Sequence, residues 1–315
     1  MKKRNNKVIV LIVVAVLFAV SLLIFILNYS KDNSSFSILE KKWINDNTSN
    51  VLDISVYNDV PVYGKSGKGV IFDLLDDFTT TYGINFNKIS YSVDSSSNLN
   101  KNAFRVLNNN ENLTNKDILL YEDNYVLVST EEEVINNIND IDNHTVAVLK
   151  TDLNTVSNDL SEVKKISYLQ KENVNELEEA LKNKETNYVI VPYNMYMDFI
   201  LKNDLHILYH LSDISKKYVL TIENKTFLDI MKKYYLGYQK NKQQTSYKTN
   251  FLSEFFYDKE ITEADRMSYN SSSYNVGYIT YMPFTGKEEK DLVGTLSNYL
   301  SGFEDLFDVD LKVKY

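Results

Sequence analysis

The sequence predicts an α/β protein with a mainly parallel sheet, preceded by one membrane-spanning helix. Short segments in which apolar residues alternate with period two are separated by segments with apolar residues at helical spacing. Strands that alternate with helices favour a sheet covered by helices on both faces. In addition, a stretch near the N-terminus is apolar throughout, and the pattern that opens the α/β region returns near the C-terminus.

The N-terminal segment is predicted to anchor the chain in a membrane. Four basic residues precede residues 8–27, in which Ser21 is the only polar residue. At about 1.5 Å per residue, a helix of this length spans the roughly 30 Å hydrocarbon core. The basic flank stays in the cytoplasm, so the rest of the chain is expected on the outer side. A cleaved signal peptide is the alternative, although its apolar region is typically shorter and ends in small residues.

Composition excludes several kinds of function. The chain has 315 residues, no cysteine and a formal net charge of -9. The lack of cysteine excludes disulfides, thiolate metal sites, a cysteine nucleophile and a lipid-modified N-terminal cysteine. An acidic chain without a basic, aromatic-rich stripe is not expected to bind nucleic acid.

The α/β region begins at Leu52, after the polar residues 30–50. Trp43, the only tryptophan, is expected there either as an interfacial membrane anchor or as a small packing contact. The predicted strands are Leu52–Tyr57, Ile84–Ile89, Asp117–Tyr121, Tyr125–Ser129, Thr145–Leu149, Lys165–Leu169 and Tyr188–Val191, and the predicted helices are Val70–Tyr82, Glu131–Ile138, 152–160, Val174–Lys182 and Tyr193–Leu201.

A glycine-rich stretch separates the first strand from the first helix. Gly64-Lys65-Ser66 supplies the last letters of a phosphate-binding loop, G-x-x-x-x-G-K-[ST], but Asp59 stands where the first glycine should be. A carboxylate there would repel a phosphate. The pattern therefore favours a turn between a strand and a helix.

The order of these segments resembles the family 3 extracellular solute-binding proteins, which have the two-lobed type II periplasmic-binding fold. The family opens with a strand that ends near an aromatic residue and a proline, followed by a loop and a helix that begins G-x-x-x-D-[LI]. The resemblance covers residues 52–256 in order and implies that the glycine-rich stretch is the first loop of a ligand cleft. It is carried by Val56-Tyr57, Pro61, Gly69-x-x-x-Asp73-Leu74, Asp123–Val128 at the crossing to the second lobe, Asn143–Val148, Glu176–Val191, the return strand Tyr218–Thr221 and the closing helices in Phe227–Phe256.

The opening pattern is repeated at the C-terminus. Residues 273–315 contain a strand, a proline, a charged loop, Gly294-x-x-x-Asn298 and a second strand, and Gly294 to Phe307 has the same spacing as Gly69 to Tyr82. About forty residues cannot bury a core alone, so this copy is expected to be incomplete. The predicted parts are a flank and anchor (1–29), a polar linker (30–50), a solute-binding-like module (51–257), a linker (258–272) and an incomplete second module (273–315).

No catalytic or metal site is predicted. His206 and His210 are four residues apart without the glutamate of a zinc-protease helix, and no G-x-S-x-G turn is present. The acidic clusters lie on the polar faces of predicted helices. We therefore expect neither an enzyme nor a cofactor in these residues.

Two functions fit the resemblance. One is a membrane-anchored extracytoplasmic sensor that feeds a kinase, diguanylate cyclase or phosphodiesterase output. The other is the substrate-binding component of an ABC-type transporter. Two modules on a protein anchor favour the sensor. The resemblance implies a small-molecule ligand, and it allows dimerisation in a signalling assembly.

The resemblance also suggests which residues line the ligand cleft. In amino-acid binders of this family an arginine after the third strand pairs with the ligand carboxylate. With Asp117–Tyr121 taken as the third strand, no arginine follows, and Asn187 aligns with the acidic residue that meets the ligand ammonium. Free amino acids are therefore not expected to bind in the usual way. The expected lining residues are Tyr57, Asn58, Tyr63, Tyr121, Thr151, Asn187 and Tyr193.

Overall fold

The computed structural model describes residues 36–93, 99–163, 165–288 and 291–314. The predicted anchor, residues 8–27, lies outside this part of the chain. None of the helices within the described ranges is both long and apolar enough to cross a membrane.

One mixed sheet of eight strands forms the centre of the molecule, in the order β4-β1-β5-β10-β6-β9-β7-β8. Strands β4, β1 and β5 run parallel, β9, β7 and β8 run parallel, and β10 is antiparallel to both β5 and β6. The strands are β1 (Val51–Tyr57), β4 (Asn85–Tyr91), β5 (Asn102–Leu107), β6 (Asp117–Ser129), β7 (Thr145–Leu149), β8 (Ser167–Lys171), β9 (Tyr188–Pro192) and β10 (His206–Ile222).

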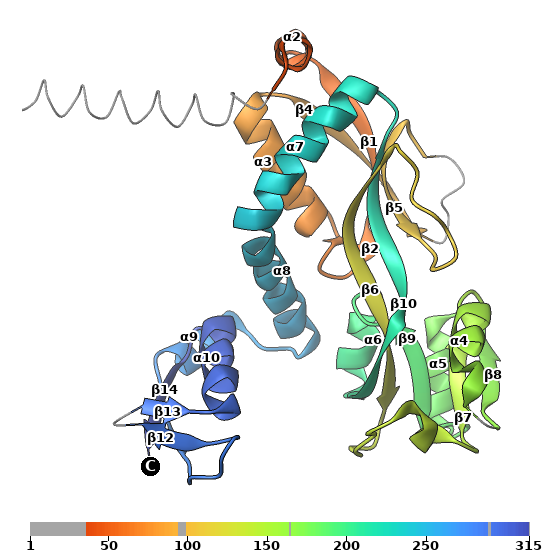
Figure 1. Cartoon of the computed structure of the whole chain (residues 1–315), viewed down its shortest axis with the longest axis vertical. Helices are drawn as coiled ribbons and strands as arrows, with labels where there is room; N and C mark the ends of the chain where they lie inside the picture. The colour runs from red at the N-terminus through yellow and green to blue at the C-terminus, as the bar shows by residue number, and fades with distance from the viewer. Residues whose placement is uncertain (1–35, 94–98, 164, 289–290, 315) are drawn as a thin grey trace, which may run out of the picture.

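Strands β6 and β10 are long because they belong to both halves of the molecule. One end of this pair lies beside β5 and the other beside β9, so the sheet divides into two lobes (Figure 1). Where the lobes meet, Leu211 pairs with Tyr125 but Ser215 pairs with Asn124, which leaves residues 212–214 of β10 outside the ladder. Such a bulge bends a strand and increases its twist.

Lobe one packs three helices against its part of the sheet. They are α2 (Ile38–Asn47), α3 (Val70–Tyr82) and α7 (Lys225–Asn241). Helix α3 places Ile71, Leu74, Leu75 and Phe78 on one buried face, as expected from their helical spacing. Its first residue follows Gly69, whose φ of +123° and close approach to Tyr63 exclude a side chain: an added Cβ would lie 2.5 Å from the Tyr63 carbonyl oxygen.

Lobe two has an apolar core on each face of its half-sheet. Helix α4 (Leu153–Asp159) contributes Val156 to one core, and α5 (Val174–Lys182) contributes Leu177 to the other. Helix α6 (Met197–Lys202) and the 3₁₀ turns η2 (Ile138–Ile141) and η3 (Leu160–Glu162) complete the lobe. Helix α8 (Gln243–Asp258) contacts α3 and α7 of lobe one and α6 of lobe two, so it spans the boundary between the lobes.

A small C-terminal unit follows α8 (Figure 1). It contains α9 (Glu263–Asn270), the parallel strands β11 (Ser273–Gly277) and β14 (Asp310–Lys314), the hairpin β12 (Gly286–Glu288) and β13 (Asp291–Val293), and α10 (Thr295–Phe307). The same order of elements occurs in lobe one, where β1 pairs in parallel with β4, the hairpin is β2 (Asp59–Val60) and β3 (Gly64–Lys65), and the helix is α3.

The sequence-based elements agree with the structure in most of the chain, with the following differences. The two strands predicted at Asp117–Tyr121 and Tyr125–Ser129 are one strand, β6, and the predicted linker 258–272 contains α9. Strand β5 was missed, so the third strand is Asn102–Leu107 and not Asp117–Tyr121, which opens β6. The predicted helix Glu131–Ile138 is irregular up to the 3₁₀ turn η2. The predicted linker 30–50 contains α2. Trp43 of α2 stacks on Phe227 of α7 with ring centroids 5.0 Å apart. Of the two roles expected for Trp43, the structure therefore shows the packing contact and not the membrane anchor.

Candidate functional site

A cavity of about 330 Å³ lies between the lobes. Lobe one contributes the C-terminal ends of β4 and β5 and the loops beside them, and lobe two contributes the turn after β7 and the segment after β9. Ligands of open α/β sheets bind at such carboxyl ends of strands, and this volume lies in the range of small-molecule sites. The lining residues are Tyr91, Val93, Leu99, Arg105, Val106, Asn108, Glu111, Thr151, Met195, Tyr196 and Lys216.

Arg105 is the half-buried cation on the lobe-one side of this interlobe cavity. It belongs to β5, where its neighbours Phe104 and Leu107 are buried in the core. Among the residues that the structure describes, no carboxylate forms an ion pair with its guanidinium. The planar guanidinium therefore offers donors to a carboxylate or another planar anion in the cavity.

A second cation, Lys216 on β10, is held in a buried network. Its ammonium lies 2.8 Å from Asp152 of lobe two and donates to the Asn108 side-chain oxygen of lobe one at 3.0 Å. The Tyr125 hydroxyl donates to the same carboxylate at 3.0 Å. Because burial and the neighbouring carboxylate both disfavour the phenolate, the pKa of Tyr125 is raised well above its usual value. The network ties both lobes to the crossing strand.

Asp123 fixes the segment that brings Met195 and Tyr196 to the cavity. Its buried carboxylate, on β6, accepts hydrogen bonds at 2.9 Å from the backbone N–H groups of Asn194 and Met195 and from the Tyr218 hydroxyl. Burial raises its pKa, although these hydrogen bonds favour the charged form. The chain after β9 is therefore bonded to both crossing strands.

Tyrosines fill the space beside the cavity. The Tyr63 ring from the glycine-rich loop lies 5.0 Å from Tyr121, 4.8 Å from Tyr218 and 6.0 Å from Tyr247 of α8, centroid to centroid. The Tyr247 hydroxyl donates to the Asn194 side-chain oxygen at 2.9 Å. Tyr63 is only 2% exposed, so this stack closes one side of the space between the lobes.

The glycine-rich loop also carries the ion pairs that join the lobes. The Lys65 ammonium lies 2.6 Å from Asp198 of α6 in lobe two and 2.6 Å from Glu254 of α8. Burial lowers the pKa of Lys65, but the hydrogen bonds to these two carboxylates outweigh it and raise the pKa overall. We refer to this three-residue arrangement as the Lys65 clamp. The loop therefore contacts both lobes, although none of its residues lines the interlobe cavity.

Asp258 completes an acidic group beside the Lys65 clamp. Carboxylate oxygens of Asp198, Glu254 and Asp258 lie within 4.8 Å of one another, a spacing that would suit a metal ion, but the Lys65 ammonium already neutralises two of these carboxylates. The Asp258 side chain is fully buried, and Lys202 lies 3.5 Å from it. Burial, followed by the proximity of Asp198, raises the pKa of Asp258 to about 6. His206 and His210, the two histidines that are four residues apart on β10, are both exposed.

The residues predicted to line a ligand site have different places in the structure. Thr151 lines the interlobe cavity. Tyr57, Tyr63 and Tyr121 lie together in the tyrosine stack, and Tyr193 is half-buried against the lobe-two core. The Asn58 side chain accepts a hydrogen bond from the Gly67 N–H at 2.6 Å and so shapes the loop.

Asn187 does not join the others. It precedes β9, whose register places Tyr188 beside Ser129 and Pro192 beside Tyr125, so Asn187 lies at the end of β9 away from the crossing. The Asn187 side chain donates to Glu131 at 3.3 Å. The alignment that placed it at the ligand therefore put the residue at the wrong end of the strand.

Sequence reasoning missed Arg105, Lys216, Met195 and Tyr196. Arg105 was missed because the third strand was placed too late in the chain. The signal was present in Ala103-Phe104-Arg105-Val106-Leu107, a short apolar run bounded by asparagines, which is typical of a buried strand. Arg105 lies on the third strand itself, and no arginine follows that strand before Arg266. The absence of amino-acid binding in the usual way stays a prediction.

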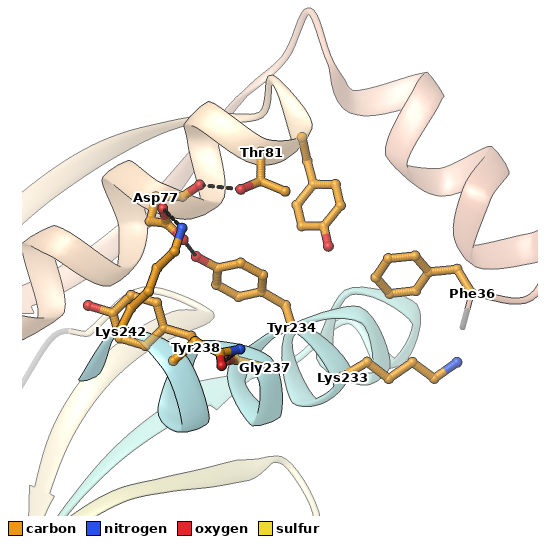
Figure 2. A pocket seen from close by; sticks show the side chains of 10 residues that line it. Phe36, Asp77, Thr81, Lys233, Tyr234, Gly237, Tyr238 and Lys242 are labelled. Carbon is orange, nitrogen blue, oxygen red and sulfur yellow. Dashed lines mark hydrogen bonds and ion pairs between the residues drawn. The ribbon is translucent and has the colours of Figure 1, made fainter. Parts of the chain in front are cut away.

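A separate cavity of about 250 Å³ lies within lobe one, between α3 and α7 (Figure 2). Asp77 of α3 accepts hydrogen bonds from Tyr234 at 2.5 Å and from Lys242 at 2.6 Å, which Figure 2 shows as dashed lines. It shares no lining residue with the interlobe cavity. Asp77 is thus paired with Tyr234 of α7 and with Lys242 just after it, whereas Lys233 of α7 pairs with Glu40 of α2 at 2.7 Å.

The raised pKa of Asp258 predicts a pH-dependent stability. The folded state binds this proton more tightly than the unfolded state, so the contribution to stability is complete below about pH 3.8 and is lost as the pH rises through about 6. We expect Asp258→Asn, which removes the titration, to raise the thermal midpoint at pH 7.5 but not at pH 4.5. Calorimetric unfolding at the two pH values measures this. Equal effects at both would contradict a raised pKa.

The fold can be compared with known proteins. No family model and no curated protein matches the sequence. Among solved structures, the periplasmic domain of Bordetella pertussis BvgS matches with 12% identity over 89% of this chain and 59% of that chain, at a TM-score of 0.52. Its isolated VFT2 domain matches with 13% identity over 68% and 97%, at a TM-score of 0.50. The chain thus spans about three fifths of the larger BvgS domain. Together with the two crossing strands, these matches show that the chain has the type II periplasmic-binding, or Venus flytrap, fold.

Proposed function

We propose that this chain is a membrane-anchored, extracytoplasmic ligand-binding region of a signal-transduction protein, and that it binds a small anionic molecule between its lobes. The observation that carries the proposal is the interlobe cavity, which both lobes line and to which Arg105 contributes a guanidinium without an ion-pair partner among the described residues. A ligand in this place contacts both lobes at once, so binding changes the free-energy difference between open and closed arrangements. Binding, and not catalysis, is the role that this geometry supports.

Arg105 is the residue expected to contribute most to ligand affinity. Lys216 already has Asp152 as a partner at 2.8 Å, whereas the Arg105 guanidinium has no ion-pair partner within the described ranges. A hydrogen bond to a charged group contributes about 1.5–3 kcal/mol. We therefore place the anionic group of the ligand at Arg105. Glu111 and Thr151 then form hydrogen bonds with the other polar groups of the ligand.

Replacement of Arg105 should weaken ligand binding without unfolding the protein. The panel for titration calorimetry is the common amino acids and small dicarboxylates. For any compound that binds, Arg105→Ala should raise Kd on the order of 10- to 100-fold, and Arg105→Lys should restore only part of the affinity, because lysine does not reproduce bidentate pairing.

The control for this experiment is Arg266→Ala, which changes an arginine of α9 outside the interlobe cavity and should leave the affinity unchanged. A ligand that binds Arg105→Ala as tightly as the unchanged protein would contradict the assignment. Circular dichroism of each variant separates lost binding from lost folding.

A signalling role is favoured over solute delivery by two features. The predicted anchor would keep the lobes at the membrane, and the C-terminal unit repeats the element order that opens lobe one. A single mobile module is enough to deliver a solute to a permease. Several modules fixed at the membrane are better suited to transmitting a conformational change.

The anchoring part of the proposal is tested by topology. A reporter enzyme that is active only outside the cytoplasm, fused after Tyr57, should be active in intact cells, because the basic residues before residue 8 remain inside. The control is the same fusion in a chain whose basic residues before residue 8 are replaced by glutamate, namely Lys2, Lys3, Arg4 and Lys7. The reporter in this control should lose its activity, because the charges that orient the membrane helix are gone. Activity of a cytoplasmic reporter at Tyr57 would contradict the proposed location.

A further inference from the structure

The C-terminal unit copies lobe one closely enough for residues to be matched one by one. Helices α3 and α10 both have 13 residues and both follow a glycine with positive φ, +123° at Gly69 and +99° at Gly294. A Cβ at Gly294 would lie 2.6 Å from the Phe284 carbonyl oxygen, as one at Gly69 would lie 2.5 Å from that of Tyr63. Counting from the two glycines, Phe303 corresponds to Phe78 and Phe307 to Tyr82.

The helices that precede the two units also correspond. In lobe one, α2 begins with a capping box formed by Ser37 and Glu40 and leads into β1. In the C-terminal unit, α9 begins with a capping box formed by Thr262 and Asp265 and leads into β11. The copy therefore includes the preceding helix, and lobe one is a template for the surroundings of α10.

In lobe one, α7 covers the aromatic face of α3. The Phe227 ring lies 6.1 Å from Phe78 and 5.0 Å from Trp43 of α2. Tyr234, seven residues later on the same helix, lies 5.0 Å from Phe78 and 5.8 Å from Tyr82. Under this cover Phe78 is completely buried.

The corresponding face of α10 is only partly covered among the described residues. Phe255 and Phe256 of α8 pack on Phe307 with ring centroids 5.7 and 6.3 Å apart, but no residue in the described ranges covers Phe303 as α7 covers Phe78. A mainly aromatic cavity of about 500 Å³ lies there, where Phe303, Phe307, Tyr274 and Leu311 face Phe255 and Phe256 of α8. Phe303 and Phe307 keep the contact of their counterparts, with centroids 4.7 Å apart against 4.9 Å for Phe78 and Tyr82. Phe303 is nevertheless 39% exposed. The aromatic pair is in place and α8 contacts its Phe307 end, but within the described ranges no helix buries Phe303.

We propose that this cavity, the α10 groove, binds an amphipathic helix with the pattern of α7. Its defining features are a phenylalanine in the first turn, which occupies the place of Phe227 over Phe303, and an aromatic residue seven positions later, which packs on Phe303 as Tyr234 packs on Phe78. The template that identifies this occupant is lobe one of the same chain, where the matched face is covered in this way. The inference is independent of any ligand in the interlobe cavity.

The experiment supplies the helix at high effective concentration. The full chain is extended after Tyr315 by a flexible glycine-serine linker and a second copy of residues 225–241, because a short tether raises the effective concentration to the millimolar range. Hydrogen exchange of α10 and β14, followed by mass spectrometry, should slow at least tenfold relative to a chain with the linker alone.

Two matched variants show whether the groove is responsible. Replacing the phenylalanine that corresponds to Phe227 by alanine in the added copy should remove the protection, and so should Phe303→Asp in the groove. Val134→Asp, at a residue of lobe two that is 82% exposed, should leave the protection intact.

Three results would overturn the proposal. The first is protection that is equal with and without the added phenylalanine. The second is no protection in any extended chain. The third is protection of the unextended chain that rises with protein concentration and is lost in Phe303→Asp, which would identify a second copy of this chain as the occupant.

Discussion

The two-lobed arrangement depends on the antiparallel pairing of β6 and β10, the two strands that both lobes share. Each lobe has its own apolar core, so the lobes are joined mainly by these strands and by what lies along them. The bulge at residues 212–214 of β10 marks the point where the ladder changes register.

Buried polar groups gather at this crossing because it is where the chain must fix one lobe against the other. Asp123 is bonded to the segment after β9, and Lys216 joins Asp152 to Asn108. Removing one partner of a buried ion pair costs about 3–5 kcal/mol, whereas the pair as a whole adds little to stability. These groups therefore act mainly by fixing one arrangement of the two lobes relative to each other, and they add little to the free energy of unfolding.

The fold was largely predictable from the sequence because hydrophobic periodicity is a local property. Helices Val70–Tyr82 and Val174–Lys182 have the predicted bounds, since each places its apolar residues on one face. The site was less predictable. Arg105 lies on a strand of six residues between asparagine-rich turns, where the periodic signal is short. Asn187 was placed at the ligand from the family resemblance alone. It precedes β9, and the five residues of this strand separate it from the crossing.

The tyrosine stack shows a second limit of sequence reasoning. The family resemblance suggested that tyrosines line the cleft, and Tyr57, Tyr63 and Tyr121 lie together in the tyrosine stack. The sequence did not indicate that Tyr218 and Tyr247, which lie in distant segments of the chain, pack against these tyrosines and fill the space. The same holds for the Lys65 clamp, whose partners Asp198 and Glu254 are 133 and 189 residues away in the chain.

The Lys65 clamp adds a second connection between the lobes to the shared strands β6 and β10, and the distance between the lobes tests its contribution most directly. The chain has no cysteine, so spin labels can be attached to cysteines introduced at two exposed positions, Leu236 in lobe one and Glu179 in lobe two. Double electron–electron resonance should give one narrow distance distribution in the labelled chain and a broader, longer one after Lys65→Ala. The same distribution in both proteins would contradict the account.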